Sequence, residues 1–308
     1  MTAPFLSVVI CTHNPRDDYF GQALAGLRAQ TLPAAEWELL VVDNRSDQPV
    51  EGRFDLSWHP NARVVREEKL GLTPARLRGI AEARGQLLVL VDDDNVLEPD
   101  YLRLALEIAD TRPWLGSWSG QCLPGFDEEP PAWTRRYWGN LCIRQFEEDV
   151  WSNLPRLPET MPAGAGLCLR RPVAERYLAL HHGGQRAFQF DRTGDSLISG
   201  GDNDLAACAC DLGLGVGLIA ALRLRHLIPP GRLTEDYLAR LADGIAFSSI
   251  LLDAERGLPV APRSRAGRLA DIVRLLRKSG PDRRVLRAAH AGRDRAARLV
   301  AEAAQRPR

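Results

Sequence analysis

The fold is decided by residues 86–95, which read Gln86-Leu87-Leu88-Val89-Leu90-Val91-Asp92-Asp93-Asp94-Asn95. Five consecutive aliphatic residues predict a buried strand. Three adjacent carboxylates follow where that strand ends. Like charges this close repel one another, so each carboxylate must stay solvated or meet a cation. The stretch therefore predicts a strand that delivers an acidic cluster to the end of a sheet.

Two apolar runs earlier in the chain, at residues 6–11 and 37–42, also predict buried strands, and residues 63–65 predict a shorter one. Residues 19–30, 73–84 and 99–110 have helical spacing. Strands that alternate with helices in this way predict an α/β fold with a doubly wound, mostly parallel sheet. Ligands of such sheets bind at the carboxyl ends of the strands. Polar residues follow three of these strand ends: Thr12 and Asn14, Asp43, and Asp92 to Asp94.

Residues 113–258 have a less regular pattern. They predict strands at 116–121, 163–169 and 217–224, and helices at 172–179, after Asp202, and at 234–255 with Thr234 as N-cap. Between them, residues 124–138 read as a loop with several aromatic side chains. Residues 259–308 predict one or two basic amphipathic helices. We therefore expect a main domain over residues 1–258 and a helical extension over residues 259–308.

The formal net charge of the 308 residues is zero, so the chain as a whole is not built to bind polyanions, and no nucleic-acid partner is expected. From Ser264 onward, however, 13 Lys or Arg stand against 4 Asp or Glu, a net charge of +9. A basic segment on an acidic body predicts contact with that body, a membrane surface or a polyanion. A solvated, arginine-rich helix face is the alternative.

Six scattered cysteines favour reduced thiols in a cytoplasmic protein. No signal peptide and no apolar segment long enough to span a membrane are recognised.

The acidic cluster at residues 92–94 suits a hard divalent cation, because Mg²⁺ and Mn²⁺ prefer carboxylate and phosphate oxygens. Such ions use only one or two protein carboxylates when substrate phosphates complete their coordination. The alternative is a polar turn in which an aspartate caps the next helix.

The stretch Gly200-Gly201-Asp202-Asn203-Asp204-Leu205 is a second candidate. Glycines let the backbone pass close to a ligand. A carboxylate at Asp202 could take a proton from an attacking hydroxyl. The alternative is that Asp202 only caps its helix.

Two further side chains are candidates for binding. Arg76 lies on the first turn of the helix predicted after Gly71, from which it could reach a pyrophosphate, unless it faces solvent. His226 follows a predicted strand and could bind a metal, although a lone histidine is more often structural. Arg232, six residues later, could meet a phosphate.

These motifs, in this order, resemble the family 2 glycosyltransferases with the GT-A fold, over about residues 5–250. The resemblance rests on residues 7–14, 41–46, 71–80, 91–102 and 200–205. It implies an inverting transfer of a sugar, hexosyl in kind, from a nucleoside diphosphate sugar to an acceptor hydroxyl. It also divides the main domain into a nucleotide-sugar-binding half, 1–112, and an acceptor-binding half, 113–258.

The resemblance implies a role for each matching residue. Thr12 and Asp43, with Asn14 beside them, match the loops that hold the nucleotide, and Arg76 matches the arginine near the diphosphate. Asp92 and Asp93 would lie near the ribose. Asp94 would bind the divalent metal ion, Mg²⁺ or Mn²⁺, and His226 matches a position that helps to bind it in some relatives. Asp202 matches the general base.

The chain departs from the family pattern in two places. Gly201 stands where the family often has Glu, and with Asn203 this leaves Asp204 as the alternative base. Leu77 stands where an Asn often follows the arginine. Neither change removes an essential charge, but both make the donor harder to infer.

The resemblance also implies partners and a location. The acceptor would be a saccharide or a lipid-linked saccharide, in bacterial-type polysaccharide or glycolipid synthesis. Trp133 or Trp138 would form an acceptor platform, with a core position as the alternative. The protein would be cytoplasmic, with a peripheral contact to an anionic membrane, at the inner face of the plasma membrane, through its basic helices.

Three other functions fit less well. A nucleotidyltransferase needs a glycine-rich loop with a basic residue after the first strand, where this chain has Thr12-His13-Asn14-Pro15. A Rossmann dehydrogenase needs Gly-x-Gly-x-x-Gly at the same place. A non-catalytic carbohydrate-binding or scaffold protein on a glycosyltransferase fold would not need to retain Asp43, Asp92 to Asp94 and Asp202.

Overall fold

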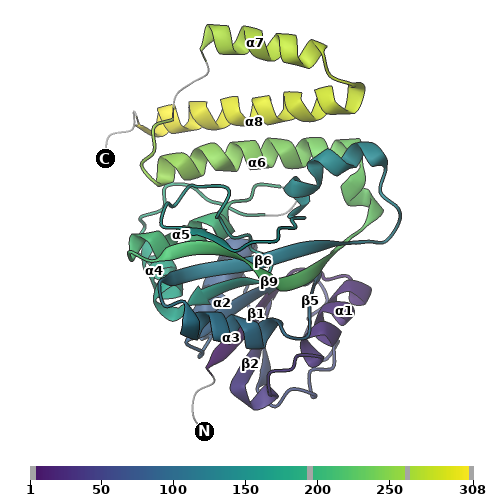
Figure 1. The fold of residues 1–308 in the computed structure, drawn as a ribbon, viewed down its shortest axis with the longest axis vertical. Coiled ribbons are helices and arrows are strands. Elements are labelled where there is room, and N and C mark those ends of the chain that lie inside the picture. The colour runs from purple at the N-terminus through teal and green to yellow at the C-terminus, as the bar shows by residue number, and fades with distance from the viewer. Residues whose placement is uncertain (1–4, 193–196, 261–263, 305–308) are drawn as a thin grey trace. The chain divides into compact units, whose positions relative to one another are not determined.

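The computed structural model describes residues 5–192, 197–260 and 264–304. Its chain divides into two compact units (Figure 1). The first, here called the sheet unit, comprises Met1–Asp127, Cys142–Gln185 and Gly201–Ile228. The second, the helical unit, comprises Glu128–Leu141, Arg186–Gly200 and Pro229–Arg308. The predicted boundary at residue 258 stays a prediction, and residues 261–263 and 305–308 of the predicted extension lie outside the described residues.

One sheet forms the centre of the sheet unit. Its strand order is β3-β2-β1-β4-β8-β6-β9-β5, and β7 also pairs with β9. The strands are β1 (Leu6–Thr12), β2 (Trp37–Asp43), β3 (Ala62–Arg66), β4 (Leu87–Asp92), β5 (Asn95–Leu97), β6 (Leu115–Phe126), β7 (Val150–Ser152), β8 (Leu167–Arg170) and β9 (Gly215–Ile228).

The first four of these strands are parallel, as the alternation of strands and helices predicts. β1 lies between β2 and β4, with Thr12 opposite Asp43 and Cys11 opposite Asp92. The strand ends that carry the predicted polar residues therefore lie at one level. This arrangement confirms the predicted α/β class.

The second half of the sheet mixes both directions, since β6 and β9 are parallel while β8, β5 and β7 pair antiparallel with their neighbours.

Three predicted strands have different bounds in the structure. β8 begins only at Leu167, so most of the predicted strand at 163–169 is a loop. β9 continues through His226, which was expected after its strand. β6 extends through Pro124, where a loop was expected. β6 pairs with β8 only at Ser117 and Trp118, so Pro124 lies beyond that ladder, where a strand tolerates proline.

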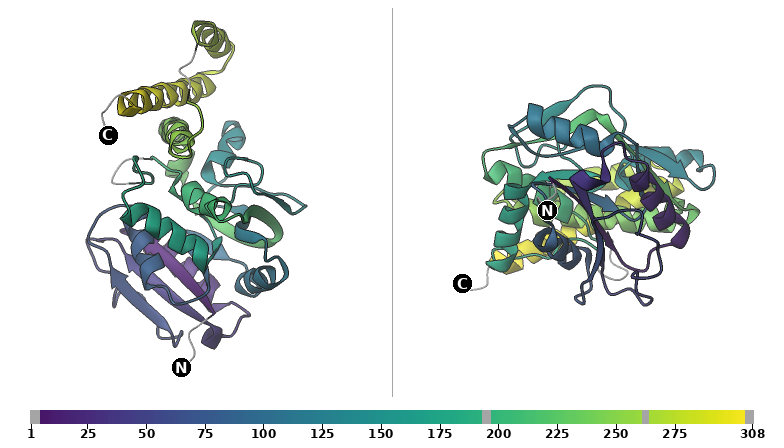
Figure 2. Two further views of the ribbon diagram at one scale, coloured as in Figure 1. Left: turned by 90° about the vertical axis from the view of Figure 1, so that its left-hand side faces the viewer. Right: turned by 90° about the horizontal axis from the view of Figure 1, so that it is seen from below.

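Helices cover both faces of the sheet (Figures 1 and 2). α1 (Asp17–Arg28) and α3 (Tyr101–Thr111) contribute to one apolar core with Val8, Ile10 and Val89. α2 (Leu72–Glu82), α4 (Arg171–His182) and α5 (Gly201–Asp211) contribute to the other with Val9, Leu40 and Leu88. Successive residues of these strands thus point into opposite cores. A short 3-10 helix, η1 (Ala34–Glu36), precedes β2.

The helical unit contains α6 (Glu235–Glu255), α7 (Arg265–Leu276), α8 (Gly280–Ala304) and the 3-10 helices η2 (Ala132–Leu141) and η3 (Pro230–Leu233). Thr234 caps α6 as predicted, because its hydroxyl accepts from the Tyr237 amide at 3.3 Å. α8 lies between α6 and α7 (Figures 1 and 2). Ion pairs between Arg295 and Asp243 at 2.8 Å, and between Arg284 and Asp236 at 2.7 Å, join α8 to α6.

In the part of the chain that the structure describes, no helix is both long and apolar enough to cross a membrane.

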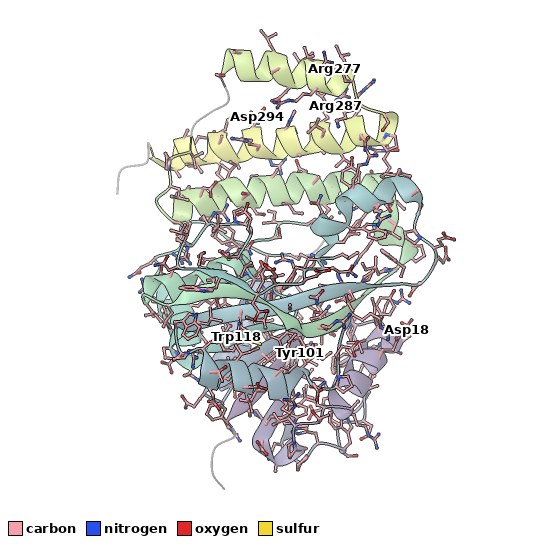
Figure 3. All side chains as sticks on the ribbon, viewed as in Figure 1. Asp18, Tyr101, Trp118, Arg277, Arg287 and Asp294 are labelled. Carbon is pink, nitrogen blue, oxygen red and sulfur yellow. The ribbon has the colours of Figure 1, made fainter. Side chains whose placement is uncertain are left out.

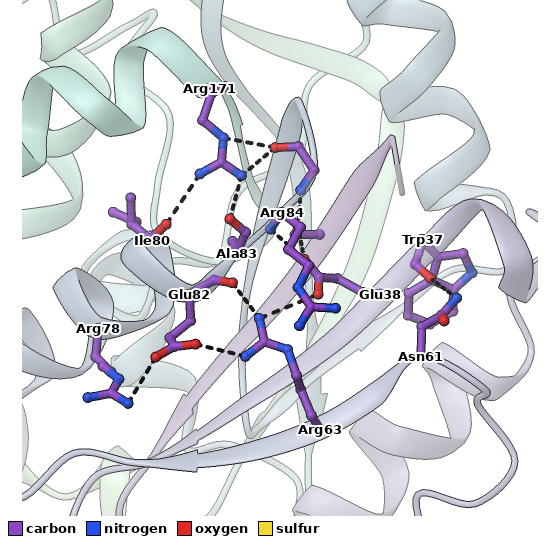
Figure 4. A network of polar contacts seen from close by, with 12 residues as sticks. Trp37, Glu38, Asn61, Arg63, Arg78, Ile80, Glu82, Ala83, Arg84 and Arg171 are labelled. Atoms are coloured by element: carbon purple, nitrogen blue, oxygen red, sulfur yellow. Dashed lines mark hydrogen bonds and ion pairs between the residues drawn. The ribbon is translucent and has the colours of Figure 1, made fainter. Parts of the chain in front are cut away.

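A buried polar network fixes the C-terminal end of α2 against the sheet (Figure 4). Glu38, buried in β2, accepts from the Ser7 hydroxyl and the Arg84 amide, both at 2.6 Å. Arg171, at the start of α4, donates to the carbonyls of Ile80 at 3.2 Å and Ala83 at 2.9 Å, and also to Gly85. Burial lowers the pKa of the Arg171 guanidinium. Its N–H groups nevertheless satisfy three carbonyl oxygens. The network is relevant to the expected site because α2 also carries Arg76, the residue expected near a diphosphate.

We predict that Arg171→Met destabilises the fold by about 2–4 kcal/mol, because buried carbonyl oxygens lose a charged donor. Urea denaturation would measure the loss. Arg176→Met, on the same helix, is the matched control. Arg176 is partly exposed and meets Asp211 at 3.7 Å, so its loss should cost less than about 0.5 kcal/mol. Equal midpoints for the wild type and Arg171→Met would contradict the structural role.

Candidate active site

The loops after β1, β2 and β4 meet at the carboxyl edge of the parallel strands. The Thr12 hydroxyl donates to Asp93, so the first loop is joined to the acidic cluster. The Thr12 carbonyl accepts from the Asn44 amide at 2.8 Å, which joins it to the second loop. The structure therefore brings together residues from three strand ends that are far apart in the sequence. Asp93 is 81 positions from Thr12, and Asn44 is 31 positions from His13.

Hydrogen bonds of Asn14 to Ser46 and Asp47 join the first two of these loops. The Asn14 backbone has a φ of 50°, and its amide donates to the Ser46 hydroxyl at 2.9 Å. The Asn14 side chain accepts from the Asp47 amide at 2.9 Å and donates to the Asp47 carboxylate at 3.0 Å. Asn14 is exposed, so its visible role is to shape the loop at the edge of the site.

Asp43 is buried and its carboxylate is engaged by the chain itself. It accepts from the amides of Ser46 at 2.9 Å and Val50 at 3.2 Å, and from Arg66 at 3.0 Å. Burial opposes ionisation of Asp43, but these hydrogen bonds and the Arg66 charge outweigh it and lower its pKa. Asp43 thus holds the loop at residues 44–50 in place.

Asn44 is a positioning residue to which the sequence assigned no role. Its side-chain oxygen accepts from the Gly71 amide at 2.8 Å, and its side-chain nitrogen donates to the carbonyls of Glu67 at 3.2 Å and Lys69 at 2.8 Å. Gly71, with a φ of 133°, directly precedes α2. Asn44 therefore fixes the start of the helix that carries Arg76. A polar residue directly after a buried strand was the signal that could have indicated it.

Arg76 and Asp202 meet at a glycine. Both side chains lie against Gly164: a methyl group added there would stand 2.9 Å from Arg76 Nη2 and 3.1 Å from Asp202 Oδ2. Arg76 is only 5% exposed, which excludes the alternative of a solvent-facing side chain. The structure therefore brings the predicted diphosphate-binding cation and the predicted base to one place, with Gly164 as the residue that makes room.

Asp202 lies in the first turn of α5, and its orientation is set by backbone amides. Oδ2 accepts from the Gly164 amide at 2.8 Å, and Oδ1 accepts from the Asn203 amide at 2.9 Å. Asn203 in turn donates to the Pro162 carbonyl at 3.3 Å. Asp204, the alternative base, is fully buried, whereas Asp202 is partly exposed.

Asp94 and His226 form a second pair. Asp94 Oδ2 lies 3.3 Å from His226 Nε2, and the two residues are 6% and 8% exposed. The pairing of β5 with β9 sets this contact, because Asn95 lies opposite His226 and the Leu227 amide donates to the Asp94 carbonyl at 2.8 Å. The side chain of Asn95 also donates to Asp94 Oδ1 at 2.9 Å.

This pair fits a metal ion that shares its coordination with a ligand. One carboxylate and one imidazole are suitable donors for Mn²⁺, and the carboxylate suits Mg²⁺. Among the described residues, no cluster of three or more His, Cys, Asp or Glu could hold a metal by itself. Phosphate oxygens and water would therefore have to supply the remaining ligands.

Three predicted residues belong to the helical unit. Arg232 is in η3, and Trp133 and Trp138 are in η2. Both tryptophans are half-buried: Trp133 packs edge-on against Tyr137, with centroids 6.2 Å apart, and the Trp138 indole donates to Thr134 at 3.2 Å. Their predicted roles in phosphate and acceptor binding stay predictions.

Comparison with known proteins agrees with the resemblance. Residues 7–151 match the model of glycosyl transferase family 2. The putative glycosyltransferase EpsH of Bacillus subtilis is 30% identical over 110 residues, which cover 35% of this chain and 31% of that protein. The matched stretches span between 12% and 31% of three curated relatives, less than a third of each.

Two solved structures share the fold. The mannosyltransferase PcManGT from Pyrobaculum calidifontis, in complex with GDP-Man and Mn²⁺, aligns with a TM-score of 0.55 at 18% identity, over 100% of this chain and 77% of that one. The S. aureus TarS fragment 1–349 in complex with UDP aligns with a TM-score of 0.50 at 17% identity, over 97% and 91%. Residues 7–151 of this chain thus match glycosyl transferase family 2, and the fold is that of the mannosyltransferase PcManGT.

Proposed function

We propose that this protein is an inverting glycosyltransferase that moves a sugar from a nucleoside diphosphate sugar to an acceptor hydroxyl. The observation that carries the proposal is the meeting of Arg76 and Asp202 at Gly164; the contact between Asp94 and His226, 3.3 Å apart, supports it. A permanent cation, a partly exposed carboxylate and a pair of metal-type ligands are the groups that such a displacement needs. Complexes of structural neighbours with UDP and with GDP-Man support a nucleotide or nucleotide-sugar ligand.

The donor would lie across the carboxyl ends of β1, β2 and β4. Thr12, Asn14 and Asp43 shape the loops for the nucleoside, and Asp92 and Asp93 would lie near the ribose. Since Asp43 is engaged by Ser46, Val50 and Arg66, it would act by positioning its loop. Arg76 would bind the diphosphate as a planar, permanently charged donor.

Asp94 and His226 would hold a divalent ion, Mg²⁺ or Mn²⁺. Bound there, the ion would act as a Lewis acid that stabilises the negative charge of the departing diphosphate. Arg76 adds to that stabilisation through charge-assisted hydrogen bonds, which are strong in a buried setting. The Mn²⁺ in the PcManGT complex supports the choice of metal.

Asp202 would act as the general base. The amides of Gly164 and Asn203 each donate to one of its oxygens, which fixes the carboxylate and leaves lone pairs for an acceptor proton. Removal of that proton as the hydroxyl attacks opposite the leaving group would invert the anomeric carbon. The full burial of Asp204 favours Asp202 over it.

The acceptor would be a saccharide or a lipid-linked saccharide, in bacterial-type polysaccharide or glycolipid synthesis. A glucosyl-dolichyl phosphate glucuronosyltransferase of Haloferax volcanii, 25% identical over 132 residues, supports a lipid-linked saccharide as acceptor. We place the protein in the cytoplasm, with a peripheral contact between residues 259–308 and an anionic membrane. The platform role of Trp133 or Trp138 remains part of this proposal.

We predict that Asp202→Asn folds normally and lowers kcat by about 10²–10⁴-fold, because the amide cannot accept the hydroxyl proton. Initial rates of sugar transfer, with circular dichroism as the folding check, would measure this. Asp211→Asn, at the other end of α5, is the control and should retain activity. If Asp202→Asn is fully active while Asp204→Asn folds without activity, the base is Asp204.

Asp94→Asn should weaken binding of the nucleotide sugar in Mn²⁺ by roughly 5- to 150-fold, the usual strength of coupling between two ligands. Calorimetric titration with Mn²⁺ and again with a chelator would measure it. With the chelator, the wild type and the variant should bind equally weakly. Asp100→Asn removes a carboxylate that meets Thr31 and Arg103 outside the site, and it should change nothing. Undiminished, chelator-resistant binding by Asp94→Asn would refute the metal role.

Gly164→Ala should lower kcat by about tenfold or more without unfolding the protein, because the added methyl group displaces Asp202 and Arg76 by a few tenths of an ångström. Kinetics and thermal melting would be measured together. Gly21→Ala is the control, since a methyl group on Gly21 of α1 meets no atom within 4 Å. Wild-type kcat in Gly164→Ala would show that the spacing of these two groups is unimportant.

A further inference from the structure

Helix α7 has an apolar stripe that the structure leaves exposed. Leu269, Ile272, Val273 and Leu276 occupy positions i, i+3, i+4 and i+7, which share one face of a helix. Their exposed fractions are 65%, 53%, 47% and 71%. Large side chains this exposed, gathered on one face, mark a surface that binds something apolar.

The opposite face of α7 packs against α8. Asp271 is buried and lies 3.7 Å from His290 of α8. The Leu275 carbonyl accepts from the Arg283 side chain at 3.0 Å. In the helical unit, α7 lies beside α8 (Figures 1 and 2), and the exposed stripe is on the face of α7 opposite these contacts.

Exposed cations lie near the C-terminal end of this stripe. Arg274 has a side chain that is 70% exposed, and Arg277 and Lys278 follow at the end of α7 and are exposed as well. Figure 3 labels Arg277, which directly follows α7, and Arg287 on α8. The net charge of +9 from Ser264 onward gives the whole segment a positive field.

An apolar stripe in a segment with a net charge of +9 fits an anionic bilayer better than a second copy of the chain. A symmetric contact between two α7 helices would bring the same arginines together. At an anionic membrane, by contrast, the aliphatic side chains enter the acyl boundary while the cations meet lipid phosphates. A helix of 12 residues is about 18 Å long, enough for this in-plane geometry.

We propose that α7 lies in the plane of an anionic membrane, with Leu269, Ile272, Val273 and Leu276 buried below the headgroups and Arg274 and Arg277 among them. The proposal deepens the membrane contact given under the proposed function, because it names the helix and the face. It requires no catalytic step and would hold for an inactive enzyme.

The test is co-sedimentation of the full chain with vesicles of phosphatidylcholine, with and without phosphatidylglycerol. The wild type should bind the anionic vesicles and not the neutral ones. The triple variant Leu269→Ser, Ile272→Ser, Leu276→Ser should bind about a hundredfold more weakly, because three apolar anchors are lost. Leu212→Ser is the matched control: this leucine is 42% exposed in the sheet unit, and its loss should leave binding unchanged.

A second variant tests the charges. Arg274→Gln with Arg277→Gln should weaken binding about fivefold for each arginine removed, and added salt should weaken the wild type in the same direction. All variants keep the buried side chains, and glutamine at position 274 can still donate to Asp271, so their melting temperatures should stay close to that of the wild type.

Three results would overturn the proposal: no wild-type binding to anionic vesicles, equal binding by the triple variant, or a wild-type dimer that the triple variant converts to a monomer without any vesicle binding. Donor hydrolysis, measured on the same samples, reports separately on the proposed transferase activity.

Discussion

The parallel pairing of β1 with β2 on one side and β4 on the other holds the site together. Its register sets Thr12 level with Asp43 and Cys11 level with Asp92. A slip of one residue would turn every side chain of β1 to the opposite face and move its apolar residues between the two cores. Because both cores are filled, with Val8 and Ile10 in one and Val9 in the other, this register is strongly fixed. The fixed register therefore also fixes where the loops after these strands begin.

Two adjacent polar residues at the end of β2 use their side chains to hold the chain. Asp43 and Asn44 are adjacent and buried, and both use their side chains on backbone groups of neighbouring loops. A lowered pKa for Asp43 means that its carboxylate is more stable ionised in this setting than in the unfolded chain. Loops fixed in this way can present Arg76 and Asp93 without relying on a ligand for their shape, which reduces the ordering cost of binding.

The strands of the first half, and the acidic cluster at their edge, were predictable from local sequence, because aliphatic runs and the residues after them are read within a few positions. Partners far apart in the chain were not predictable in this way. Gly164 lies against Asp202, 38 positions away, and nothing near Gly164 in the sequence indicates it. His226 lies inside β9, and its contact with Asp94 depends on pairing across 132 positions. Tertiary pairing, which local periodicity does not encode, decides both contacts.

The proposed metal site at Asp94 and His226 would have few protein ligands, which has a consequence for the order of binding. Two protein donors would leave most of the coordination of a Mg²⁺ or Mn²⁺ ion to water and phosphate oxygens. The free energy that a diphosphate gains from the ion equals the free energy that the ion gains from the diphosphate. The proposed site would therefore hold the metal weakly alone and tightly with the donor. The diphosphate product would have the same phosphate oxygens as the donor, so the same coupling would also slow its release.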